Sequence, residues 1–96
     1  MVDDKKSTTV VEEQYTSEQV LDFIKERLKI LMTAKEYEVA CENMETFMDA
    51  PLTDYGLDSL DIANLVMWCE DEFDAVIEYD VRYSDISINE IIKQSL

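Results

Sequence analysis

Apolar side chains recur every three or four positions in three separate stretches of the chain, which is the spacing of one helix face. Before the first stretch, Thr16 and Gln19 have the spacing of a capping box, and Tyr15 and Val20 have that of a hydrophobic staple. We therefore predict a helix that begins directly after Thr16. Its inward face would carry Val20, Leu21, Ile24, Leu28 and Leu31.

The second stretch runs from Ser59 to about Asp74. Asp58 stands at the position of an N-cap, and Leu57 and Ile62 have the spacing of a staple. This stretch therefore predicts a second main helix. Its core face would consist of Ile62, Leu65, Val66, Cys69 and Phe73.

The third stretch predicts a last helix that begins at Ser87. Glu90 lies three residues later, as in a capping box, and Ile86 and Ile91 have staple spacing. Ile88, Ile91 and Ile92 would face inward. Just before this helix, residues 80–84 are expected to form a short helical turn.

The segment 33–48 keeps helical spacing of its apolar residues without a strong start or stop signal, so we predict a long connection that contains a short helix. Pro51 and Gly56 bracket the loop that follows, with Leu52 and Tyr55 as its inward anchors. This chain of 96 residues has one Gly and one Pro, too few for the turns of a multi-stranded sheet.

The predicted fold class is therefore all-α. We expect a small antiparallel four-helix bundle, built from three main helices and one short helix, with a long first connection. Residues 1–15 show no helical period and are predicted to be a mobile tail, which leaves residues 16–96 as a single domain.

The net charge of −15 indicates what kind of partner the chain meets. A field this negative repels nucleic acid and anionic membranes, and it attracts basic protein surfaces. No basic residue lies between Lys35 and Arg82. The middle of the chain is therefore either a docking region or a solvated acidic face that serves solubility.

Metal, disulfide and membrane chemistry find little support in the sequence. The two cysteines, Cys41 and Cys69, have no metal-ligand or redox spacing, and the chain contains no histidine. The acidic runs lack the alternating ligands and central Gly of an EF-hand loop. No apolar run is long enough to span a bilayer, and the polar start is unlike a signal peptide. We expect a cytoplasmic monomer with reduced, mostly buried cysteines and no metal site.

Ser59 lies where a loop becomes the second main helix. A catalytic serine needs a base to take its proton, and this serine stands in no Gly-x-Ser-x-Gly or Ser-x-x-Lys motif. Catalysis by Ser59 is therefore not expected. The residue is either an acceptor of a covalent group or simply a common residue at a helix start.

A strip beside the core face of this helix combines apolar and acidic side chains. It has the composition of a docking surface, although Leu60 and Met67 could instead belong to the periphery of the core. On the opposite side, Trp68 either is covered by the segment 33–48, which we favour, or anchors a partner. The predicted partner-binding residues are Leu60, Asp61, Ala63, Met67, Glu70, Asp71 and Asp74.

The segment GLDSLD, residues 56–61, followed by LVM at 65–67 and EDEFD at 70–74, resembles the phosphopantetheine-attachment segment of acyl carrier proteins. The resemblance is close over residues 49–80, and the order of helices agrees with it from residue 17 onward. It implies that a phosphopantetheinyl transferase moves 4′-phosphopantetheine from coenzyme A onto Ser59. Asp58 and Leu60 would flank the attached group, and Asp58 and Asp61 would serve the transferase and its metal ion.

The same resemblance implies a non-catalytic carrier that holds acyl groups as thioesters on the arm. The acyl chain would fold back between the helices, against Leu65, Val66, Cys69 and Phe73. The implied partners, besides the transferase, are ketosynthase, acyltransferase or ligase enzymes of fatty-acid, polyketide or related biosynthesis, which would present basic docking patches.

Several residues favour a specialised carrier over the housekeeping fatty-acid carrier. Asn64, Trp68 and Cys69 depart from the residues usual in the family, and the loop 51–56 is similar to that of polyketide-type carriers. A different class of function also fits the composition: an acidic helical interaction module of the same fold that docks on a basic partner without a prosthetic group.

Overall fold

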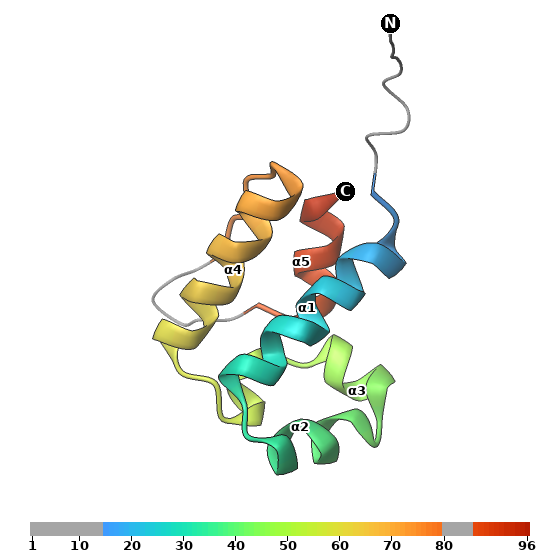
Figure 1. Cartoon of the computed structure of the whole chain (residues 1–96), viewed down its shortest axis with the longest axis vertical. Coiled ribbons are helices and arrows are strands. Elements are labelled where there is room, and N and C mark those ends of the chain that lie inside the picture. The colour runs from blue at the N-terminus through green and yellow to red at the C-terminus, as the bar shows by residue number, and fades with distance from the viewer. Residues whose placement is uncertain (1–14, 80–85) are drawn as a thin grey trace, which may run out of the picture.

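A computed structural model describes residues 15–79 and 86–96, and within these ranges the chain is helical with no strands (Figure 1). The all-α prediction is thereby confirmed. The predicted tail, except for Tyr15, and the predicted short helix at 80–84 lie outside the described residues. The elements in order are α1 (Ser17–Leu31), α2 (Ala34–Cys41), α3 (Met44–Asp49), the 3₁₀ helix η3 (Leu52–Tyr55), α4 (Ser59–Phe73) and α5 (Ile88–Ser95).

The helices α1, α4 and α5 form the body of the bundle, and each packs against the other two. The chain runs down α1 and back up α4 and α5 (Figure 1). Fully burying a side chain of the size of Leu or Phe stabilises the fold by about 1.5–3 kcal/mol, so the shared core dominates stability. Together with one residue each from α3 and η3, these helices supply the largest fully buried side chains among the described residues: Val20, Ile24, Leu28, Phe47, Leu52, Ile62, Leu65, Cys69, Ile88 and Ile91.

The predicted first residue of α1 and its capping box are confirmed. The Gln19 N–H donates to Thr16 Oγ1 at 3.1 Å, and the Thr16 N–H donates to Gln19 Oε1 at 2.9 Å. These bonds satisfy donors that have no acceptor within the helix.

The segment 33–48 contains two short helices, α2 and α3, where the sequence predicted one. The start of α2 carries a signal that sequence analysis missed: Thr33 and Glu36 form a complete capping box, at 3.1 and 3.0 Å. Asn43 caps α3 by accepting the Thr46 N–H. The two caps divide a stretch whose apolar spacing alone looked continuous.

The N-cap predicted for α5 is present, but the complete box is not. Ser87 Oγ accepts the Glu90 N–H at 3.2 Å, and within the described residues the Glu90 side chain does not return a bond to the Ser87 backbone.

The loop before α4 is anchored as predicted. Leu52 is fully buried, and its N–H donates to the Ile86 carbonyl at 3.0 Å. Tyr55 is half-buried, with its ring centroid 4.6 Å from that of Phe47 on α3. This loop therefore fixes the start of α4 against the rest of the bundle.

Candidate functional site

Gly56 turns the chain from the 3₁₀ helix η3 toward α4. Its φ of +87° lies in the left-handed region, which only glycine adopts at little cost. Space is not the constraint, because the nearest atom to an added Cβ would be Glu36 Oε2 at 3.9 Å. Beyond this turn Leu57 is buried and Ser59 is exposed, so one hydrophobic anchor holds the loop while the serine faces outward.

The nearness of the Glu36 side chain to Gly56 places α2 next to the site. Glu36 is 20 positions away from Gly56 in sequence, and no spacing rule links the two residues. Sequence analysis missed this neighbour, and only its role in the α2 capping box could have drawn attention to it.

Asp58 and Asp61 form a reciprocal capping box at the start of α4. Asp58 Oδ1 accepts the Asp61 N–H at 2.8 Å, and Asp61 Oδ2 accepts the Asp58 N–H at 3.2 Å. The N-cap assignment of Asp58 is confirmed. Both carboxylates have a local structural role, beyond the role toward a transferase that the family resemblance implied.

Ser59 is the first residue of α4 and is exposed. Its N–H and that of Leu60 belong to the first helical turn, where no intrahelical acceptor exists. Such groups, together with the helix dipole, favour an anion beside them. An accessible hydroxyl next to these donors fits a phosphodiester on the serine oxygen, although the two flanking carboxylates oppose its charge.

Two apolar side chains of the predicted strip are exposed and do not belong to the periphery of the core. Leu60 is 70% exposed and Met67 is 57% exposed, while Ala63 is half-buried. Asp71 and Asp74 are also exposed, and Asp74 ends α4 in the left-handed conformation with φ of 51°. One side of α4 therefore presents apolar side chains beside carboxylates.

Glu70 belongs to this strip in sequence but is engaged within the fold. Its Oε2 accepts the Ile77 N–H at 2.9 Å, which holds the segment after α4 against the helix. One residue further on, the Gln94 side chain of α5 bonds Glu78 in both directions: its Oε1 accepts the Glu78 N–H at 2.7 Å, and its Nε2 donates to the Glu78 carbonyl at 2.9 Å. Glu70 is therefore a structural residue as well as a candidate docking residue.

The residues expected to contact an acyl chain lie in the core. Leu65 and Cys69 are fully buried, and Val66 and Phe73 are 4% and 7% exposed. Burial raises the pKa of the Cys69 thiol from 9.0 to about 12, so this thiol is protonated at neutral pH.

Trp68 is half-buried and packs against the core. The Arg27 guanidinium carbon lies 5.1 Å from the Trp68 ring centroid and 4.9 Å from that of Phe23. Part of the cover of Trp68 therefore comes from α1, whereas the sequence analysis expected it from the segment 33–48.

Both cysteines are free: Cys41 is half-buried and Cys69 is buried. In the part of the chain that the structure describes, no group of His, Cys, Asp and Glu side chains is arranged to hold a metal ion. No helix among the described residues combines the length and apolarity needed to cross a bilayer.

Ser59 is thus an exposed serine at the first position of α4, one of the three helices that form the body of the bundle. Comparison with protein families matches residues 32–94 to the family described as phosphopantetheine attachment site, and the chain belongs to this family. Its prosthetic group is 4′-phosphopantetheine, bound covalently. Searches of curated proteins and of solved structures gave no significant match.

Proposed function

We propose that Ser59 Oγ is the atom that carries 4′-phosphopantetheine and that the protein is a non-catalytic acyl carrier. The observation that carries this proposal is the exposure of Ser59 at the first position of α4, inside the region that matches the family. The absence of histidine from the chain supports a serine that accepts a group over one that catalyses a reaction.

The attachment reaction is a phosphoryl transfer from coenzyme A, performed by a phosphopantetheinyl transferase. The Ser59 Oγ–phosphorus bond forms, the bond from phosphorus to the 3′,5′-ADP leaving group breaks, and the hydroxyl proton passes to a base of the transferase. The N-terminal turn of α4 favours the resulting anion, and the capping box keeps the Asp58 and Asp61 carboxylates turned toward backbone N–H groups. When bound, the group supplies a thiol that holds an acyl chain as a thioester.

Ser17 offers a matched control for this proposal. It is the first residue of α1, as Ser59 is of α4, and like Ser59 it is exposed and directly follows the N-cap residue of a capping box. The protein would be incubated with coenzyme A, Mg²⁺ and a promiscuous transferase, and its intact mass measured. We expect the mass gain on the wild type and on Ser17→Ala, and none on Ser59→Ala. A gain on Ser59→Ala, or no gain on the wild type, would contradict the proposal.

The exposed side of α4 is the proposed docking surface for the transferase and for acyl-loading and acyl-processing enzymes. Leu60 and Met67 would supply adaptable apolar contacts, and Asp71 and Asp74 would attract Lys and Arg of the partner. The half-buried Asp61 and Ala63 lie on the same stretch and would contribute at its edge.

Ile30 of α1, 64% exposed, serves as a matched control for Leu60. We expect Leu60→Ala to lower kcat/KM of the transferase about tenfold, as for a side chain central to an interface, and Ile30→Ala to leave it unchanged. Equal effects of the two substitutions would argue against this surface. If a basic partner binds equally well to Ser59→Ala and wild type and no prosthetic group is ever acquired, the interaction-module alternative is favoured.

The tight burial of Leu65, Val66, Cys69 and Phe73 supports a short acyl cargo. An acyl chain can reach these side chains only by opening the packing between helices, which costs dispersion contacts. The unfolding temperature of protein loaded with acetyl or octanoyl groups tests this. We expect the two forms to melt together, whereas a marked rise with octanoyl would show that the core accepts a long chain.

A further inference from the structure

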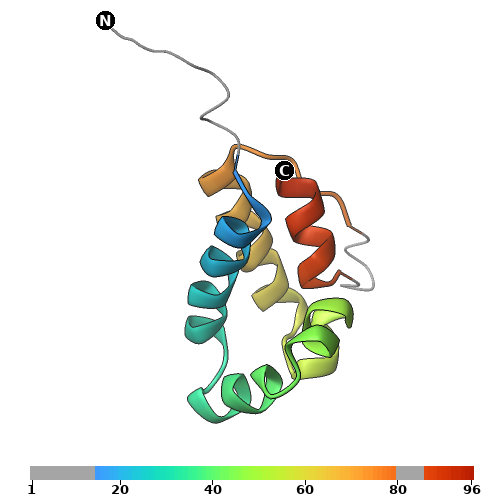
Figure 2. The ribbon, with the colours of Figure 1, turned by 90° about the vertical axis from the view of Figure 1, so that its right-hand side faces the viewer.

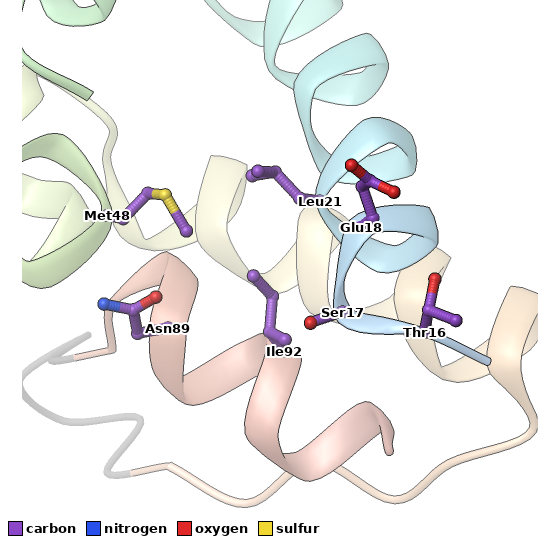
Figure 3. Close-up of a pocket in the computed structure, with 7 residues that line it drawn as sticks. All are labelled: Thr16, Ser17, Glu18, Leu21, Met48, Asn89 and Ile92. Carbon is purple, nitrogen blue, oxygen red and sulfur yellow. The ribbon is translucent and has the colours of Figure 1, made fainter. Parts of the chain in front are cut away.

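A surface groove lies between the first turn of α1, the end of α3 and the first half of α5 (Figure 3). Its volume is about 570 Å³. Leu21, Met48 and Ile92, one from each helix, point into it from three sides and form an apolar floor. Glu18 lies on its rim. The site described above uses none of these residues.

The groove continues across the surface of α3 and α5. Asn89 lines both this groove and a neighbouring depression, and Asp49 lines that depression and a third one on α3. The two residues are joined by a 3.2 Å hydrogen bond from Asn89 Nδ2 to Asp49 Oδ1. The three hollows therefore adjoin one another at these two residues, and we call them together the α1–α3–α5 groove.

The charges along this groove have one sign. Its described lining contains four carboxylates and neither Lys nor Arg. One of them lies on the rim of the hollow with the apolar floor and the other three line the two adjoining hollows, so they suit a partner with several spaced cations better than a single small cation. They belong to Glu18, Glu45, Asp49 and Glu90.

The described lining of the groove contains no residue of α4, which carries the proposed site of attachment. Figure 2 looks onto the side where α1 and α5 stand next to each other with α3 below α5, and α4 lies behind them. Met48 lines the groove, whereas Met67 is exposed on α4 and does not belong to the described lining, so the two methionines report on separate sites.

We propose that the α1–α3–α5 groove docks a basic amphipathic helix of a partner protein. Apolar side chains spaced along one face of such a helix would meet Leu21, Met48 and Ile92, and flanking Lys or Arg would pair with the acidic rim. The Met48 side chain adapts to different apolar partners. This docking is independent of Ser59, so a tethering partner can hold the carrier while the α4 face stays free for an enzyme.

Methionine methyl groups provide built-in reporters of the two sites. The full chain, as the Ser59→Ala variant, would be labelled with ¹³C in the methyl groups of methionine and titrated with a synthetic Lys/Leu peptide that forms an amphipathic helix. We expect a saturable shift of the Met48 methyl signal at peptide concentrations that leave Met67 unmoved. Met32, which is 6% exposed, reports any general change of the fold.

Two double variants separate the groove from general charge attraction. Glu18→Gln with Glu90→Gln removes two charges from the groove, and Asp71→Asn with Glu72→Gln removes two exposed charges from α4. We expect the first pair to weaken the peptide affinity reported by Met48 about threefold to tenfold and the second pair to leave it within about twofold, as for exposed ion pairs.

Three outcomes would overturn this proposal. The first is a shift of Met67 at lower peptide concentration than Met48, and the second is an equal loss of affinity in both double variants. The third is concentration-dependent broadening of the Met48 signal without peptide, accompanied by dimers in sedimentation, which would make a second copy of this chain the occupant. The phosphopantetheine assay is unaffected by any of them, so this inference and the proposed function fail separately.

Discussion

Asp58 and Asp61 hold each other's backbone N–H groups at the start of α4, at 2.8 and 3.2 Å. The family resemblance alone assigned these carboxylates to the transferase and its metal ion. The capping box gives the two carboxylates a structural role as well, because it fixes the helical turn that carries Ser59. A substitution here therefore acts on both stability and modification, and the two effects can be separated.

Asp58→Ala should lower the free energy of unfolding by about 1 kcal/mol, the usual cost of removing an N-cap side chain. Asp58→Ser keeps a capping oxygen without the charge and should remain within a few tenths of a kcal/mol of the wild type. Urea unfolding measures both. If the alanine and serine variants are equally stable, the cap is not stabilising. If the stable serine variant is modified slowly, the carboxylate serves the transferase as well.

Glu70→Ala should lower the free energy of unfolding by about 1.5–3 kcal/mol, because a charged acceptor is lost from a partly buried backbone N–H. Glu70→Gln retains a side-chain oxygen and should recover part of this loss. Asp71→Ala, at the exposed neighbouring position, should change stability by less than about 0.5 kcal/mol. Equal stability of Glu70→Ala and Asp71→Ala in urea unfolding would show that the bond to Ile77 is of no consequence.

Gly56→Ala should cost about 1–2 kcal/mol, because the φ of +87° is unfavourable for any residue with a Cβ. Steric overlap adds little, since the nearest neighbour of that Cβ would be 3.9 Å away. Gly56→Asn is the informative control, because Asn tolerates the left-handed region better than Ala. Thermal unfolding should rank wild type above Asn and Asn above Ala. An alanine variant as stable as the wild type would contradict the backbone explanation.

The Cys69 thiol should make folding less favourable at alkaline pH. Its pKa rises from 9.0 to about 12 on burial, so the unfolded chain loses this proton at a lower pH than the folded chain. The contribution to stability is fully present below pH 9 and is lost as the pH rises toward 12. We expect the free energy of unfolding to fall over this range more steeply for the wild type than for Cys69→Ala.

Tyr37 is present in both the wild type and Cys69→Ala, so its ionisation contributes equally to the two pH profiles. Its pKa is also raised, from 10.0 to about 12, by burial first and by a hydrogen bond with Cys41 second. The expected difference in slope thus belongs to Cys69 alone. Parallel alkaline profiles of wild type and Cys69→Ala would show that ionisation of the buried thiol does not contribute to the pH dependence of stability.

The starts of α1, α4 and α5 could be predicted because an N-cap acts within one helical turn. Thr16 and Gln19, Asp58 and Asp61, and Ser87 and Glu90 stand three residues apart, so their contacts do not depend on the rest of the fold. The same signal at Thr33 and Glu36 was overlooked because the apolar spacing of 33–48 appeared continuous.

The sequence by itself determined the helical class, the core faces of the main helices and the family to which GLDSLD points, since these depend on local spacing. Only the tertiary structure decided that Glu70 holds Ile77, that Arg27 covers Trp68 and that Leu21, Met48 and Ile92 enclose an acidic groove. The physical reason is the separation along the sequence of the residues that interact. Caps and helix faces arise within a few residues, whereas these contacts join segments that meet only when the helices pack.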